Sequence, residues 1–352
     1  MRRLATMVAI AALAWTGLWL VARGALEREV GLALAAGRAA GRLSAPAQFF
    51  VAGFPGRFDL FLDRIILDNP ETGTRYRTTD LRASLALWRP WAVRLVLPRR
   101  QDLTLSHGAL TFSAGGAEFT LALRPRPSLP LDLITIDAGG LHIAGPAGSV
   151  GIDDLSASFG AQPEGGASYA LSLVLHGIAP DQTLAALFIA PGETGVPPEA
   201  GDMAASDGRG VPPAEARGTM TLDLDLELSA PIDRHMNAMP AYLLAADLQG
   251  LRFDLGDLHI RARGRIEADD DGLAQGEITA RIAGWQVIPD ALARSGAISA
   301  SFAPVLHRLL EAYARQQAES AADQDLTLVL RFLDGRGFLG PFPLGPAPRL
   351  AP

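Results

Sequence analysis

Most of the chain alternates between apolar and polar residues, and this alternation predicts β-strands. In the clearest segment, Thr219–Leu228, Met and Leu side chains on one face alternate with Thr, Asp and Glu side chains on the other. A period of two is typical of a strand with one dry face and one face in water. The same pattern recurs in Phe58–Leu60, Leu81–Leu87, Phe119–Leu123, Tyr169–Leu175, Ile278–Ile282 and Leu326–Phe332.

Short segments rich in Gly, Asn and Asp separate these strands and read as turns. They are Asn69-Pro70, Ala114-Gly115-Gly116, Ala138-Gly139-Gly140 and Asp271-Gly272. Parallel strands need crossovers of about a dozen residues or more, so the short spacings favour antiparallel meanders. We therefore predict a mainly β fold, with antiparallel meanders forming a curved sheet, sandwich or groove with a few helices, preceded by one N-terminal transmembrane helix.

The longest uncharged segment lies at the N-terminus, from Leu4 to Ala22. As a helix rising about 1.5 Å per residue, it covers most of a hydrocarbon layer of about 30 Å. This length favours a retained anchor, although Ala22-Arg23-Gly24 also allows cleavage of a leader before Ala25. Arg2 and Arg3 place the N-terminus on the cytoplasmic side. We expect a single-pass protein of the bacterial inner membrane, held by residues 4–22, with its C-terminal body in the periplasm.

Helices are few. Phe302–Ser320 carries apolar residues at i, i+3, i+4 and i+7, and Ala25–Arg42 continues the anchor helix with Leu26, Val30 and Leu34 on one side. A short helical turn is predicted from Asp181. The predicted division of the chain is residues 1–24 as anchor, 25–43 as juxtamembrane helix, 44–190 as first β-rich half, 191–218 as flexible linker or loop, and 219–350 as second β-rich half containing helix 302–320.

A strand followed by Pro-Asp and a helical stretch occurs twice, at Pro180-Asp181 and at Pro289-Asp290. Two interpretations are open: a duplicated sheet-then-helix unit, or the ordinary use of Pro and Asp where helices begin.

The composition excludes several classes of function. The chain has no cysteine, so it has neither disulfides nor a thiolate metal site, and its net charge of −7 argues against a nucleic-acid partner. Gly335–Gly340 matches G-x-G-x-x-G, but prolines follow where a phosphate-binding helix would begin, so a turn is the better interpretation. Asp269–Gly272 lacks the calcium-loop spacing and reads as a hairpin tip.

No pair of histidines has metal-binding spacing, and no nucleophile motif is present. We therefore expect no catalytic residue, no cofactor and no metal, and a non-enzymatic role. A hydrolase whose site is assembled only by folding stays open as a further hypothesis.

Arginine is dense between residues 57 and 100, and Trp88 and Trp91 flank Arg89-Pro90. Arginine with tryptophan suits a lipid headgroup boundary, whereas the alternative is a solvated sheet face with two core tryptophans. The candidate headgroup or membrane-proximal contacts are Arg57, Trp88, Arg89, Trp91, Arg99 and Arg100.

Two segments carry a resemblance to a known family. Gly53-Phe54-Pro55-Gly56-Arg57-Phe58-Asp59 follows shortly after the anchor, and Asp334–Pro346 reads DGRGFLGPFPLGP. Together they resemble the alphaproteobacterial envelope family called domain of unknown function 2125, over roughly the whole chain. More distantly, an anchor followed by long antiparallel strands is similar to AsmA-type proteins, which implies a hydrophobic groove that moves phospholipid between membranes.

The dry strand faces outnumber the helical surfaces that could cover them, so they either pack on one another as a closed sandwich or line a groove. A groove would expose an apolar patch that marks a lipid or partner site. We therefore expect a membrane-anchored periplasmic protein that binds or passes lipid along an apolar groove. The alternative is an envelope scaffold with a closed β-core, and the expected partner is phospholipid or another envelope protein.

Overall fold

The computed structural model describes residues 2–43, 48–69, 72–105, 108–146, 148–163, 166–181, 217–236, 240–295, 298–317, 325–340 and 342–351. The chain divides into two compact units. Unit 1 comprises residues 1–146, 155–161 and 232–239. Unit 2 comprises residues 147–154, 162–231 and 240–352. The domain boundaries proposed from the sequence stay a prediction.

Unit 1 begins with one long helix, α1 (Arg2–Ala39), which joins the predicted anchor and juxtamembrane helix without a break. By length and composition α1 is able to cross a membrane. Ten strands follow: β1 (Gln48–Ala52), β2 (Arg57–Asp63), β3 (Ile65–Asn69), β4 (Thr74–Thr78), β5 (Leu81–Ala86), β6 (Arg89–Leu97), β7 (Arg100–Leu105), β8 (Gly108–Ser113), β9 (Gly116–Leu123) and β10 (Leu131–Gly145). All their pairings with one another are antiparallel.

Successive short strands of unit 1 are halves of longer strands that bend at a crease. Residues 131–139 of β10 pair with β9 and residues 142–144 pair with β8, so β8 and β9 lie end to end along one neighbour. In the same way β2 and β3 pair with β5 and β4. The left-handed backbone of Arg64, Asp80 and Gly140, with φ of 48°, 56° and 58°, marks three of the bends.

Two predicted turns are therefore wrong. Ala114-Gly115-Gly116 and Ala138-Gly139-Gly140 bend their strands but do not reverse the chain. Glycine with positive φ allows either a hairpin or a kink, and the local sequence does not distinguish them. By contrast, Asp271-Gly272 does form a hairpin turn, as predicted. The turn predicted for Gly335–Gly340 is wrong for most of that segment, because the chain reverses at Asp334-Gly335 and Arg336–Leu339 form a strand.

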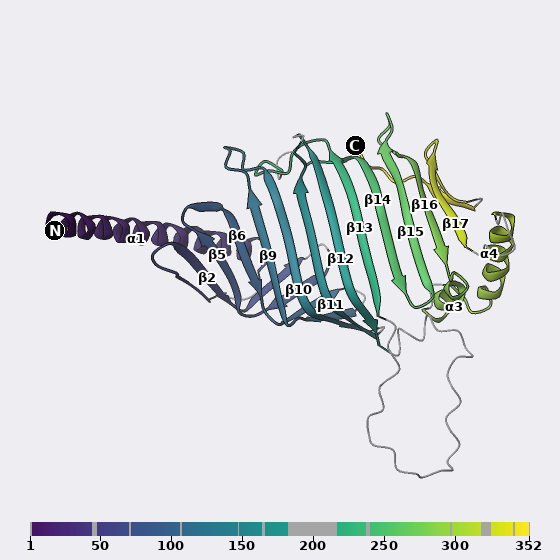
Figure 1. Cartoon of the computed structure of the whole chain (residues 1–352), viewed down its shortest axis with the longest axis horizontal. Helices are drawn as coiled ribbons and strands as arrows, with labels where there is room; N and C mark the ends of the chain where they lie inside the picture. The colour runs from purple at the N-terminus through teal and green to yellow at the C-terminus, as the bar shows by residue number, and fades with distance from the viewer. Residues whose placement is uncertain are drawn as a thin grey trace, which may run out of the picture. The chain divides into compact units, whose positions relative to one another are not determined.

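Strand β11 (Gly148–Ala161) has residues in both units. The rest of unit 2 contains β12 (Ser168–Pro180), β13 (Gly218–Leu228), β14 (Leu243–Leu255), β15 (Leu258–Ala268), β16 (Ala274–Ala283), β17 (Leu326–Leu333), β18 (Arg336–Leu339) and β19 (Phe342–Pro346), with helices α3 (Val287–Arg294) and α4 (Ala303–Gln317). From β12 to β19 each strand pairs antiparallel with the next. Figure 1 shows β12 to β17 side by side in one layer, with α3 beyond one end of β15 and β16 and α4 beside β17.

The predicted mainly antiparallel β fold is confirmed, and the strands form an open sheet. All seven segments with alternating residues are strands, and the predicted C-terminal helix is α4. Residues 318–320 of that helix, the helical turn after Asp181 and nearly all of segment 191–218 lie outside the described residues.

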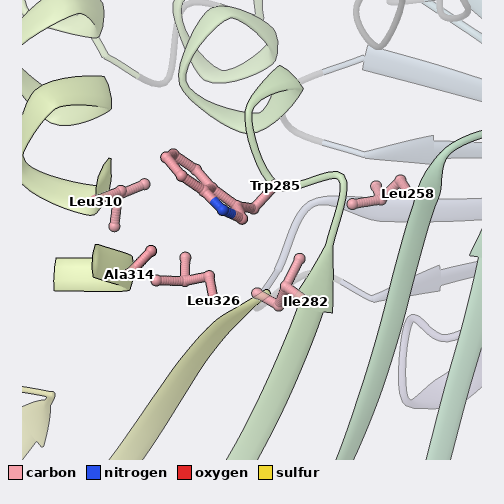
Figure 2. Close-up of a cluster of buried hydrophobic side chains, with 6 residues drawn as sticks. All are labelled: Leu258, Ile282, Trp285, Leu310, Ala314 and Leu326. Atoms are coloured by element: carbon pink, nitrogen blue, oxygen red, sulfur yellow. The ribbon is translucent and has the colours of Figure 1, made fainter. Parts of the chain in front are cut away.

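The best-defined core of unit 2 lies where α3 and α4 meet the sheet. Trp285, Leu310 and Ala314 from the helical region pack with Leu258, Ile282 and Leu326 from the strands (Figure 2). Leu306, Leu310, Tyr313 and Ala314 of α4 thus cover the ends of β15 to β17, whereas Val305 and Leu309 of the predicted apolar stripe are exposed.

Strand β17 offers a matched test of this core. Leu326 is 1% exposed, whereas Leu333 at the other end of the strand is 46% exposed. We expect Leu326→Ala to lower the free energy of unfolding by about 2–5 kcal/mol through the cavity it leaves, and Leu333→Ala by less than about 1 kcal/mol. Chemical unfolding of the detergent-solubilised chain measures both, and equal losses would show that the α3–α4 contact is not a packed core.

Candidate functional site

The sheet of unit 2 has one face built entirely of apolar residues and glycine, which we call the β12–β17 apolar face. Each of its four cross-strand rows takes one residue from each strand in turn. The rows are Leu175, Met220, Phe253, Ile260, Ile282 and Leu326; Leu173, Leu222, Leu251, Ala262, Ala280 and Leu328; Leu171, Leu224, Leu248, Gly264, Ile278 and Leu330; and Tyr169, Leu226, Ala246, Ile266, Gly276 and Phe332.

Helices cover only one edge of this face. The first row contributes Ile282 and Leu326 to the buried cluster under α3 and α4. In the remaining rows the leucines are only half-buried, among them Leu222, Leu224 and Leu330. An apolar face this wide would normally be covered by a second layer, because burying apolar surface is the main favourable term in folding.

The strands of unit 1 form a layer that repeats this arrangement. One row crosses it as Val51, Leu60, Ala83, Leu95, Phe119 and Ile136, and the next as Phe58, Leu85, Val93, Leu121 and Ile134. Helix α1 covers only the first strands of this face, because Trp19, Ala22 and Leu26 pack with Val51 and Phe58.

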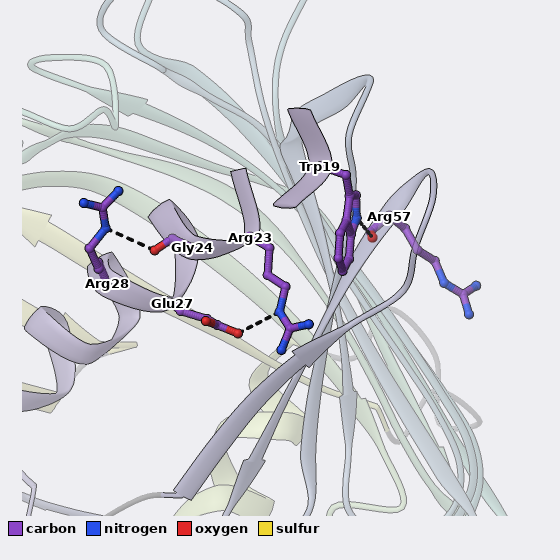
Figure 3. A network of polar contacts seen from close by, with 6 residues as sticks. All are labelled: Trp19, Arg23, Gly24, Glu27, Arg28 and Arg57. Carbon is purple, nitrogen blue, oxygen red and sulfur yellow. Dashed lines mark hydrogen bonds and ion pairs between the residues drawn. The ribbon is translucent and has the colours of Figure 1, made fainter. Parts of the chain in front are cut away.

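The contact between α1 and the β1–β2 loop is specific. The Trp19 ring is 5% exposed, stacks on Phe58 at 5.7 Å and meets Phe54 edge-on at 5.4 Å. Its indole N–H donates to the carbonyl of Arg57 at 3.2 Å (Figure 3). The indole of Trp15 donates to the carbonyl of Pro55 at 2.8 Å. One helical turn later, Arg23 pairs with Glu27 at 2.8 Å. Two tryptophans within the predicted anchor therefore hold the strand loop against the helix.

These contacts satisfy most of the main-chain carbonyls of the loop. Gly53 accepts from the amide of Arg57 at 3.2 Å, and Gly56 accepts from the amide of Leu87 at 3.1 Å. With the two indole bonds to Pro55 and Arg57, four carbonyls of segment 53–57 have donors.

The structure brings only some of the predicted headgroup residues together. Arg57 and Arg89 both lie opposite Ala86, on the two sides of β5. Trp88 lies directly over Gly56, so that a Cβ on Gly56 would come within 2.7 Å of the indole. Trp91 is half-buried farther along β6. We call segment 53–57 with Trp88 and Arg89 the tip of unit 1.

Arg99 and Arg100 lie at the other end of β6, at the crease. At about 3.3 Å per residue they are about 36–40 Å from Trp88 along the chain. In the sequence these residues group by arginine density alone. The contacts of Trp15 and Trp19 with the tip, and of Phe54 within the tip with Trp19, follow only from the packing of α1.

Asp59 supplies the only buried carboxylate among the described residues, at 3% exposure. It accepts from Ser84 at 2.7 Å and pairs with Arg57 at 2.9 Å and Arg82 at 3.2 Å. Burial alone would raise the pKa of Asp59, but the Ser84 hydrogen bond and the two guanidinium charges lower it below its ordinary value of 3.8. Asp59 thus ties Arg57 of the tip to β5.

Because the folded pKa of Asp59 is below the unfolded one, its stabilising effect is present above the unfolded pKa and is lost as pH falls below about 3.8. We expect Asp59→Asn to lower the free energy of unfolding by about 1–3 kcal/mol at pH 7 and to approach the wild type near pH 2. The exposed Glu118, paired with Arg94, gives the control Glu118→Gln, expected to cost less than about 1 kcal/mol. A wild-type advantage over Asp59→Asn that does not change with pH would contradict this account.

No group of three His, Cys, Asp or Glu side chains is placed to hold a metal within the part of the chain that the structure describes.

Comparisons with known proteins add one finding. No curated protein and no solved structure matches the chain. The comparisons do not show the more distant AsmA-type relation. One family profile, described as an uncharacterised protein conserved in bacteria, matches residues 19–348. Because that match covers nearly the whole chain, the protein belongs to the DUF2125 family.

Proposed function

We propose that this protein is a single-pass protein of the bacterial inner membrane whose periplasmic β-body binds lipid chains on its apolar sheet faces. The observation that carries the proposal is the β12–β17 apolar face, of which the helices cover one edge only. Monomeric soluble proteins rarely expose contiguous apolar patches larger than a few hundred Å², and larger patches mark lipid or partner sites.

The position of the tip of unit 1 on α1 supports attachment of the protein to a bilayer. The uncharged residues before Trp15, Leu4–Ala14, would cover only about 16 Å as a helix, roughly half of the hydrocarbon layer. For α1 to cross the bilayer, Trp15–Ala22 must also enter it, together with the tip that is hydrogen-bonded to them. We therefore place the tip in the outer leaflet.

The tip suits that environment. In hydrocarbon an unpaired main-chain carbonyl costs several kcal/mol, and four carbonyls of segment 53–57 have donors. Phe54 and Trp88 are 53% and 66% exposed, as expected for aromatic rings that insert among lipids. Arg57 and Arg89 beside them can extend their charged ends toward headgroups.

The apolar face of unit 1 starts at the same place. Phe58 follows the tip directly and packs on Trp19, while Val93 and Leu121 continue its row away from α1. A lipid chain that leaves the bilayer beside α1 would therefore meet apolar side chains without crossing a polar rim. Binding rather than catalysis is part of this proposal, and the absence of a nucleophile motif in the sequence supports it.

Lipid binding is tested on strand β13, where the two faces alternate. We expect the full chain, purified in detergent, to retain lipid that mass spectrometry detects. Leu222→Glu should reduce the retained lipid several-fold, because a carboxylate on the apolar face opposes hydrocarbon. Thr221→Glu, one residue away on the polar face, is the control and should leave the amount unchanged. The scaffold function would be favoured instead by two results together: the wild type retains no lipid, and Leu222→Glu abolishes a crosslink that the wild type forms to an envelope protein.

Membrane contact and orientation are tested with single cysteines, because the chain has none of its own. In spheroplasts, a maleimide that cannot cross membranes should label Asp271→Cys on the exposed β15–β16 hairpin. Trp88→Cys should react several-fold more slowly until detergent dissolves the bilayer. Labelling of Asp271→Cys only after lysis would contradict the periplasmic orientation, and equal rates for both variants would contradict insertion of the tip.

A further inference from the structure

The polar face of the unit 2 sheet carries three arginines directly opposite one another on adjacent strands. Arg252 of β14 faces Arg261 of β15, which faces Arg281 of β16. Arg263 lies two residues beyond Arg261 and therefore on the same face. We call these four residues the arginine row. In a chain of net charge −7, it is a local concentration of positive charge.

Nearby acids do not neutralise the arginine row. Asp254 holds His259 at 2.7 Å, Asp247 and Glu267 both lie 3.6 Å from Arg265, and Glu277 holds Arg331 at 3.1 Å. Within the described residues, none of the four arginines has an ion pair, and all four are exposed. Like charges directly opposite on neighbouring strands destabilise a sheet unless something compensates them.

A polar hollow of about 690 Å³ adjoins the arginine row on the same face. Arg263 and Thr279 line it, together with the carboxylates of Asp247 and Glu277 and the amides of Gln249 and Gln275. Its floor includes the main chain of Gly264 and Gly276, where a Cβ would come within 2.2 Å and 2.3 Å of carbonyl oxygens on the neighbouring strand. The hollow thus offers acceptors and amides beside a group of cations.

We propose that the arginine row and this hollow bind a polyol phosphate, either as a free molecule or as a lipid headgroup. Guanidinium groups recognise phosphate oxygens through paired hydrogen bonds, and three of them lie within about 10 Å across the strands. The carboxylates and amides of the hollow accept and donate hydrogen bonds to hydroxyl groups. Because the site lies on the opposite face from the β12–β17 apolar face, it does not depend on the proposed function.

The test uses the full chain in an uncharged detergent at low ionic strength. Glycerol 3-phosphate and inorganic phosphate are titrated by calorimetry. Dihexanoylphosphatidylglycerol and dihexanoylphosphatidylcholine, which have equal chains, form the lipid arm. We expect Arg261→Gln to weaken binding of the phosphorylated polyol about tenfold or more, since a hydrogen bond to a charged group is lost. Without ligand this variant should melt no lower than the wild type, because like-charge repulsion is relieved.

Arg94→Gln removes the same charge from an exposed ion pair in unit 1 and is the matched control. Binding of glycerol 3-phosphate supports a free ligand. Selective binding of phosphatidylglycerol over phosphatidylcholine, lost in Arg261→Gln, supports a headgroup. Inorganic phosphate binding as tightly as glycerol 3-phosphate would overturn the role of the hollow. No binding in any arm, or equal weakening by Arg94→Gln and Arg261→Gln, would overturn the site.

Discussion

The constraint on which the rest of this structure depends is that an amphipathic sheet must cover its apolar face. Each unit builds a single layer of antiparallel strands whose inward-pointing residues are apolar row after row. At roughly 25 cal/mol per Å², completing the burial of the half-buried leucines in rows such as Leu173–Leu222–Leu251 would add a further favourable term. Helices α3 and α4 cover one edge in unit 2, and α1 covers the first strands in unit 1. The area that the helices leave uncovered is the observation on which the proposal of lipid binding rests.

Helix α1 packs against the first strands of unit 1. The apolar surface of α1 has two sides. Trp19 and Leu26 pack on β1, β2 and β5, whereas Leu18 and Val21 stay exposed. An anchor joined by a loose tether would leave the body free to move away from the membrane. Here the indole hydrogen bonds to Pro55 and Arg57 fix the first hairpin to the helix at the depth of Trp15 and Trp19. In the proposed membrane arrangement, the tip therefore lies at the same depth in the bilayer as Trp15 and Trp19.

Alternation predicted the strands because a period of two is a local property, and Thr219–Leu228 shows it residue by residue. The creases at Ala114–Gly116 and Gly140 were not predictable, because glycine permits both a bend and a reversal and only the pairing partner decides between them. In the sequence, Trp15 and Trp19 look like ordinary apolar residues of the predicted anchor. Their contacts with the β1–β2 loop are visible only in the structure. Arg252, Arg261 and Arg281 are far apart in sequence, and only the register of β14, β15 and β16 aligns them.

That register depends on one irregularity. Along β14 the residues of the apolar face are Ala246 and Leu248 at even positions, and then Leu251 and Phe253 at odd positions. The pairings shift at the same place: residues 248–251 of β14 lie opposite residues 222–224 of β13 and 262–264 of β15, so β14 has one extra residue, and Gln249 and Gly250 form the bulge. Without the extra residue, Arg252 would point into the apolar face and Phe253 into the polar one, because a shift of one residue exchanges the faces of a strand. The bulge therefore keeps the apolar rows continuous and places Arg252 opposite Arg261, so one inserted residue serves both faces of the sheet.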